Sequence, residues 1–157
     1  MGELIERLVF INMTIIDVKE DIRTWKLTKE RLINLSIGFA ALLVLEFIAR
    51  PFYRPYVYKN NINDFHFADT AGNTLGVIAA IFILIGFIGK GRTQHLVLIK
   101  IITISMVSYE VGQPLLGKQI DPWDIFATIV TGAICYLLYK FIHPSALRKE
   151  EVRGKAT

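Results

Sequence analysis

The sequence predicts an all-α, polytopic membrane protein: four transmembrane helices in two parallel hairpin repeats, preceded by a cytoplasmic amphipathic helix. Of its 157 residues, 53% are hydrophobic and 20% are charged, against roughly 45–50% and 25% in soluble domains. The apolar residues form four continuous blocks of bilayer length, at 32–49, 71–89, 96–114 and 123–142. These blocks disfavour a soluble enzyme and a disordered tail. The single cysteine, Cys135, disfavours a secreted disulfide domain.

The first predicted unit, residues 1–31, is an amphipathic helix. Its apolar residues recur at alternating steps of four and three: Leu4, Leu8, Ile11, Ile15, Val18, Ile22 and Trp25. The apolar core of this stretch is too short to cross a bilayer. Two interpretations stay open, a helix in the membrane interface and a helix that pairs with another helix. The second would use a homo-oligomer or a cytoplasmic protein partner.

The second unit, residues 32–142, holds the four spans, and residues 143–157 form a basic cytoplasmic tail. Each span must be helical, because lipid offers no partner for backbone N–H and C=O groups. A barrel is excluded, since the blocks are continuous rather than alternating. The outer connections are expected at 50–70 and 115–122. Two prolines open the first, so we expect no simple continuation of the helix there.

The distribution of Lys and Arg predicts the orientation. Thirteen of them precede the first span, separate the second from the third, or stand at or beyond the C-terminal end of the fourth, whereas four lie in the two other connections. The positive-inside rule then places both termini in the cytoplasm, as in a multi-pass protein of the cell inner membrane. Lys100, near the start of the third span, is expected to snorkel to the same face. Topology thus explains the net charge of +4, and we expect no nucleic-acid partner.

An internal repeat relates the two halves. In the first, Glu46 precedes Arg50-Pro51, and Asp69-x-x-x-Asn73-x-x-Gly76 opens the second span. The second half has the same order: Glu110, Gln113-Pro114, Asp124-x-x-x-Thr128 and Gly132. Both units start inside. Parallel repeats of this kind pack about an axis along the membrane normal, and sites form where they meet.

Polar residues gather at the outer ends of the spans, and ionisable groups at membrane depth by default face a bundle interior or a cavity. The candidate ligand-binding residues are Glu46, Arg50, Asp64, His66, Asp69, Asn73, Glu110, Gln113, Lys118, Asp121 and Asp124. Three chemistries fit them. The carboxylates together with His66 suit a divalent cation as ligand. The positively charged side chains of Arg50, Arg54 and Lys118 suit the phosphate of a lipid. A carboxyl group in a low-dielectric pocket suits general acid–base catalysis.

Structural roles compete for most of these residues. Asp69, Asp121 and Asp124 stand where helix caps or first-turn acids are expected. Other interpretations concern side chains near the membrane surface: a helix-surface ion pair for Glu46 and Arg50, an interfacial side chain for His66, and no site role for His95 or His143. Glu110 is the hardest to explain structurally, because no cation adjoins it in its span.

The segment from Glu110 to Gly132, with Gln113, Asp124 and the loop between them, resembles the VanZ-like family. That family carries a Glu, a nearby Gln, a basic loop and Asp-x-x-x-Asn-x-x-Gly, and Asp64-Phe65-His66-Phe67 is similar to a further stretch of its pattern. The resemblance covers about 80 residues, over spans two to four. Here Lys118 replaces the family Arg and Thr128 the family Asn. The resemblance implies a bacterial inner-membrane protein of the cell envelope, associated with resistance to glycopeptide antibiotics.

Two functions therefore compete. The first is a VanZ-like protein whose outward-facing polar cluster binds an envelope lipid headgroup or similar ligand, with a divalent cation as an optional cofactor. The second is a structural or effector subunit of a homo-oligomeric or multi-component membrane complex, assembled through residues 3–26. An enzyme is less favoured, since the chain has no Ser-His-Asp, His-Glu-x-x-His or Cys-x-x-Cys set.

Overall fold

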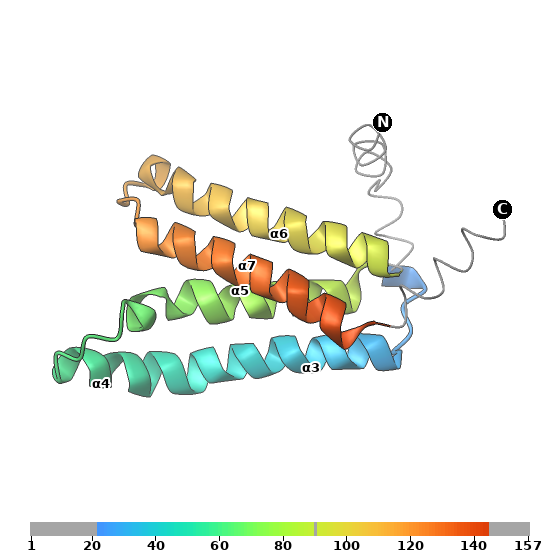
Figure 1. The fold of residues 1–157 in the computed structure, drawn as a ribbon, viewed down its shortest axis with the longest axis horizontal. Coiled ribbons are helices and arrows are strands. Elements are labelled where there is room, and N and C mark those ends of the chain that lie inside the picture. Colours follow the sequence, from blue (N-terminus) through green and yellow to red (C-terminus); the bar gives the residue numbers. More distant parts are fainter. Residues whose placement is uncertain (1–21, 90, 145–157) are drawn as a thin grey trace.

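A computed structural model describes residues 22–89 and 91–144 (Figure 1). In chain order the elements are α3 (Lys29–Val44), the π-helix η1 (Leu45–Tyr53), α4 (Arg54–Lys59), α5 (Phe67–Phe87), α6 (Arg92–Gly112), the 3₁₀-helix η2 (Gln113–Leu116) and α7 (Pro122–Ile142). No strand occurs in these two ranges. The all-helical prediction is confirmed. Most of the predicted amphipathic helix and of the basic tail lies outside the described residues.

Four helices are long and apolar enough to cross a membrane: Lys29–Lys59, Phe67–Phe87, Arg92–Leu116 and Pro122–Ile142. Each contains most of one predicted block. Large apolar side chains such as Phe47, Ile104, Leu137 and Phe141 are exposed along them. Water would not tolerate so much apolar surface, whereas a bilayer does. The prediction of a multi-pass membrane protein with four transmembrane helices is supported at this level.

The long helices lie alongside one another and alternate in direction (Figure 1). The start of α3, the end of α7 and the α5–α6 connection share one end, called here the proximal end. The other end, called the distal end, holds the connections 60–66 and 117–121.

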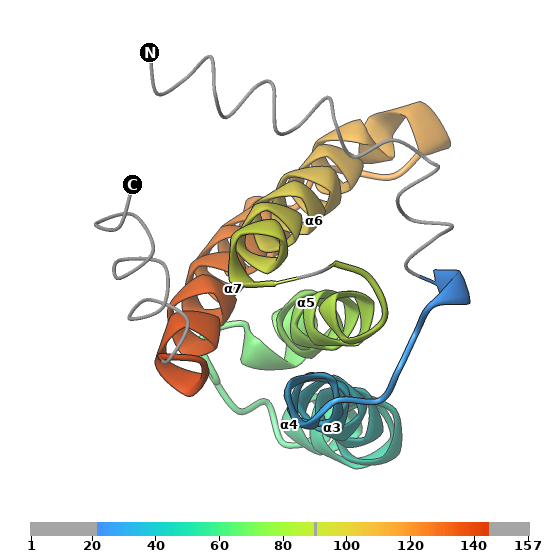
Figure 2. The same cartoon turned by 90° about the vertical axis from the view of Figure 1, so that its right-hand side faces the viewer.

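Helix α5 is central: viewed end-on in Figure 2, α3, α6 and α7 surround it, and it packs against all three. The largest core cluster follows this arrangement and contains Val77, Ile81, Phe82, Ile85, Ile99, Cys135 and Tyr139. The closest pair is α3 and α5. Gly38 permits it, since a Cβ there would stand 2.8 Å from the backbone nitrogen of Ile83. Small residues let transmembrane helices approach in this way.

The first outer connection, expected at 50–70, is shorter than predicted, because the helix continues past Pro51 as the π-helix η1 and then as α4 to Lys59. The buried residues Ala41, Leu45, Ala49 and Val57 are spaced by multiples of four. In an α-helix, four residues turn the chain by about 40° more than one full turn. A row of side chains spaced in this way would therefore rotate gradually away from α5. The wider π turns keep it in place. A wider turn also accommodates Pro51, which cannot donate the hydrogen bond of an α-helix.

Side chains define the helix starts at both ends of the bundle. Thr28 accepts a hydrogen bond from the Arg31 amide at 3.2 Å and caps α3. Asp121 accepts from the Trp123 amide at 2.8 Å and caps α7, which confirms its predicted capping role. Arg31 also donates to the carbonyl oxygens of Phe87 and Gly89, both at 3.3 Å, and so satisfies acceptors at and just beyond the end of α5.

Candidate functional site

A buried carboxylate marks the distal half of the bundle. Glu110 stands in the last turn of α6 and is only 6% exposed. Gln113, one turn further on, donates a hydrogen bond to its carboxylate. The charges of Asp124, Asp121 and Lys118 all act on this group. The α6–α7 connection therefore brings together five of the residues that the sequence indicated.

Glu110 lines a cavity of about 250 Å³ between α5, α6 and α7. The lining residues are Gly72, Asn73 and Val77 from α5, Ser105, Met106, Tyr109 and Glu110 from α6, and Thr128 from α7. Asn73 also donates a hydrogen bond to Asp124. The predicted candidates from different helices thus converge, and the cavity offers a carboxylate, an amide and hydroxyl groups to a ligand.

Thr128 has a hydroxyl without a partner. This side chain is 1% exposed, and its Oγ1 makes no hydrogen bond within the described part of the chain. Helical threonines usually donate to the carbonyl one turn back, as Thr70, Thr74 and Thr103 do here. A buried, unsatisfied polar atom is costly. The hydroxyl of Thr128 is therefore available to a bound molecule in the cavity.

A second polar group surrounds Asp69, at the distal end of α5. Asp69 accepts a hydrogen bond from Tyr58 and lies 3.3 Å from Nδ1 of His66 and 4.0 Å from the Arg54 guanidinium. His66 stacks on Trp123, with ring centroids 5.0 Å apart. The charges of Asp69 and Arg54 also act on Asp124. The Asp69 group therefore adjoins the cavity without lining it.

Other candidates make local contacts away from the cavity. Glu46 and Arg50 form the expected ion pair at 2.6 Å, and both side chains are at least 40% exposed. Asp64 accepts from the Ala68 amide at 2.7 Å and from the Tyr53 hydroxyl at 3.1 Å, so it satisfies a first-turn amide of α5, whereas Asp69 is an acid within that first turn. Lys118 differs from these three: it is exposed in the α6–α7 connection, but its charge acts on Glu110.

A metal centre receives no geometric support. In residues 22–89 and 91–144, no group of three or more His, Cys, Asp or Glu side chains is arranged to hold a metal ion. The carboxylates are instead hydrogen-bonded to Gln113, Asn73, Tyr58 and backbone amides. The divalent cation considered from the sequence therefore has no identified ligand set.

The sequence interpretation missed a polar network at the proximal end. The Tyr139 hydroxyl, fully buried, donates to Glu30 at 2.9 Å and contacts Nδ1 of His95 at 2.7 Å. His143 contacts the Asn34 side-chain oxygen at 3.1 Å. Three helices are joined by these contacts. The interpretation of His95 and His143 as unremarkable end residues overlooked this network.

Both burial and neighbouring charges shift the pKa of His143. Its pKa lies below the usual 6.5, because burial disfavours the imidazolium form. The charge of Arg92 lowers the pKa further, while that of Glu30 opposes both effects. Arg92 itself is 6% exposed, and its Nε and Nη2 have no hydrogen-bond partner among the described residues.

One signal in the sequence pointed toward this network. Tyr139 and His143 are separated by four residues, as are Glu30 and Asn34, so each pair shares a helix face. Nothing in the sequence alone, however, brings the two faces together.

Comparisons of the chain with protein-family models, curated proteins and solved structures find no match.

Proposed function

We propose that this chain is an integral membrane protein that binds the polar headgroup of an envelope lipid or a similar ligand. The binding site would be the cavity lined by Glu110 and Thr128, called here the distal pocket. One observation carries the proposal: the buried Glu110 carboxylate and the unpartnered Thr128 hydroxyl line the same cavity. Burying such groups in a transmembrane bundle is costly, and groups of this kind mark sites by default. Packing alone would favour apolar residues there.

The chemistry of the cavity defines the ligand class. A volume of about 250 Å³ accommodates a small headgroup rather than a whole lipid. The Glu110 carboxylate accepts hydrogen bonds from hydroxyl or ammonium groups. Lys118 and Arg54, which act electrostatically on the acids of this end, suit a phosphate. A phospholipid whose headgroup carries an ammonium or hydroxyl group combines these features.

The finer topology belongs to the same proposal. Both termini would face the cytoplasm, and the distal end would open toward the outer side of an inner membrane, in accord with the Lys and Arg distribution. Two parallel hairpin repeats and a VanZ-like role at the cell envelope would fit this topology. Contacts of α3 with α5 and of α6 with α7 support the hairpin pairing. The alternative, a complex assembled through residues 3–26, depends mainly on residues outside the described ranges.

A binding titration tests the proposal. The full chain in detergent would be titrated with phosphatidylethanolamine and phosphatidylglycerol, and bound lipid would be counted by native mass spectrometry. Loss of one hydrogen bond to a buried ligand group costs about 1–3 kcal/mol, so Thr128→Val and Glu110→Gln should each weaken binding roughly 5- to 150-fold.

Thr131→Val is the matched control, because Thr131 is also buried on α7 but does not line the cavity. It should bind like the unmodified chain. Equal affinity in all three variants, with normal folding, would refute the proposal.

A further inference from the structure

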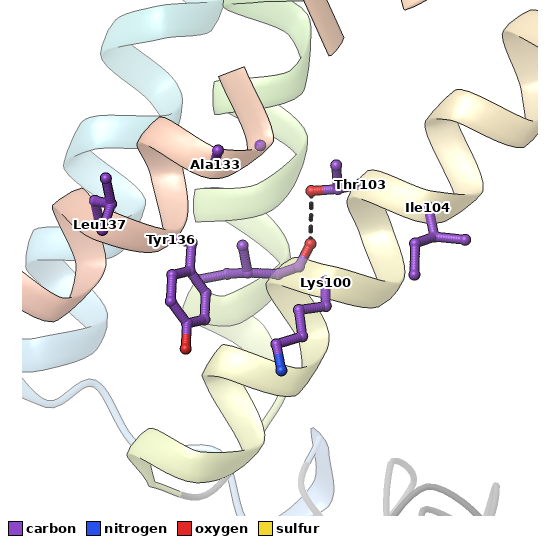
Figure 3. Close-up of a pocket in the computed structure, with 8 residues that line it drawn as sticks. Lys100, Thr103, Ile104, Ala133, Tyr136 and Leu137 are labelled. Carbon is purple, nitrogen blue, oxygen red and sulfur yellow. Dashed lines mark hydrogen bonds between the residues drawn. The ribbon is translucent and has the colours of Figure 1, made fainter. Parts of the chain in front are cut away.

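A second hollow lies between α6 and α7, nearer the proximal end, and has about 470 Å³ of space (Figure 3). It shares no residue with the distal pocket. Its lining comes from Ile99, Lys100, Thr103 and Ile104 of α6, and from Gly132, Ala133, Tyr136 and Leu137 of α7. We call it the α6–α7 groove. It opens on the surface that the bilayer would cover, since Ile104 and Leu137 are more than 60% exposed.

The floor of the groove is apolar because of how its small residues pack. Gly132 lacks a side chain and so allows Thr103 to approach α7 closely. The Thr103 hydroxyl donates to the Ile99 carbonyl at 2.8 Å, the bond drawn in Figure 3. Its hydrogen-bonding capacity is therefore met within its own helix. The inner surface of the groove is therefore apolar, as the hydrocarbon chain of a lipid is.

One side of the groove is basic. The Lys100 ammonium lies 5.9 Å from the centre of the Tyr136 ring, and the Lys140 ammonium lies 5.2 Å from the same centre. In Figure 3 the Lys100 ammonium and the Tyr136 hydroxyl point the same way, toward the start of α6. Two cations and a phenol therefore flank an apolar groove. Basic pockets between transmembrane helices on the cytoplasmic side bind anionic lipid headgroups.

We propose that the α6–α7 groove holds an acyl chain of an anionic phospholipid, with Lys100 and Lys140 on its phosphate. Charge complementarity identifies this occupant. A neutral apolar partner would gain nothing from two ammonium groups, whereas a phospholipid presents its phosphate and its chain in the order that the groove does. Each ammonium near the membrane surface favours an anionic over a zwitterionic lipid by roughly 5-fold. The inference is independent of the distal pocket.

The test compares two lipids of equal chain length on the full chain in detergent. Phosphatidylglycerol and phosphatidylcholine would be titrated, and bound lipid would be counted by native mass spectrometry. The unmodified chain should prefer phosphatidylglycerol. Lys100→Gln and Lys140→Gln should each lower that preference roughly 5-fold. Ala133→Leu should reduce binding of phosphatidylglycerol by filling the groove, and it should fold normally, because Ala133 is exposed.

Lys59→Gln, at the distal end of α4, is the matched control and should leave the preference unchanged. Equal binding of the two lipids by the unmodified chain would overturn the proposal. Unaltered binding in Ala133→Leu would also overturn it, since the lipid would then lie elsewhere on the surface. So would a dimer that Ala133→Leu dissociates, because a second copy would then occupy the groove.

Discussion

Replacing Tyr139 with Phe removes one oxygen atom from the centre of the proximal network. The Tyr139 hydroxyl donates to the Glu30 carboxylate at 2.9 Å and lies 2.7 Å from Nδ1 of His95. The ring stays, so apolar packing around α7 changes little. Tyr139 is fully buried, and water cannot simply replace the lost oxygen. The variant therefore isolates the hydrogen bonds that join α3, α6 and α7.

The magnitude follows from the two contacts. A hydrogen bond to a charged group contributes about 1.5–3 kcal/mol and a neutral one about 0.5–1.5 kcal/mol, but polar contacts between transmembrane helices average nearer 0.6 kcal/mol. Glu30 is 41% exposed, so water compensates it in part. His95 is not compensated, because its side chain is 3% exposed. We expect Tyr139→Phe to lower the free energy of unfolding by about 1–3 kcal/mol.

Thermal unfolding in detergent, followed by intrinsic fluorescence, measures the effect. A loss of about 2 kcal/mol corresponds to roughly 4–8 °C in the unfolding temperature. Tyr136→Phe, one turn earlier on the same helix, is the control, since no hydrogen bond of the Tyr136 hydroxyl is identified within residues 22–89 and 91–144. A double-mutant cycle with Glu30→Gln gives the coupling energy. Equal unfolding temperatures for the two tyrosine variants would refute the assignment.

Three further predictions concern stability in the same assay. Because the pKa of His143 is lowered in the folded chain, the unfolded chain takes up the proton first as the pH falls. The free energy of unfolding should therefore be at its full value above pH 6.5 and decrease below it, and His143→Gln should flatten this dependence. A flat pH profile in the unmodified chain would contradict the direction of the pKa shift. Gly38→Ala should destabilise by about 1–3 kcal/mol, because the new Cβ would meet the Ile83 backbone, whereas Gly72→Ala, with open space around it, should stabilise by up to about 1 kcal/mol; the opposite order would exclude close α3–α5 packing. Arg31→Met should cost about 0.5–1.5 kcal/mol by freeing two carbonyl oxygens beside the end of α5, and no change would mean that water replaces the guanidinium there.

The number and type of the long helices were predictable because bilayer-length apolar blocks have one satisfactory backbone solution. The helix path through Pro51 was not predictable by the same reasoning. A proline is normally taken as a helix end, and only the spacing of the buried residues Leu45, Ala49 and Val57 in multiples of four indicates wider turns. The central position of α5 also depends on packing, which apolar blocks of similar composition do not specify.

The distal site was partly predictable, since the carboxylate of Glu110 stood alone in an apolar span. Sequence could not tell which candidates line the cavity. Asp64 and Asp69 are both near the start of α5, and backbone geometry decides which one accepts a hydrogen bond from a first-turn amide. The proximal network was missed for a related reason. His95 and Tyr139 are 44 residues apart, so only tertiary contact unites them.

The π-helical segment makes the spacing between α3 and α4 sensitive to chain length. A single inserted or deleted residue in Leu45–Tyr53 would rotate everything beyond it by roughly a quarter turn relative to α3. Arg54 and Tyr58 would then turn away from Asp69, although no residue of that group had changed. The Leu45–Tyr53 segment therefore sets the direction in which α4 presents its side chains to the Asp69 group. Changes in the length of this segment should damage that group as much as substitutions of its own residues.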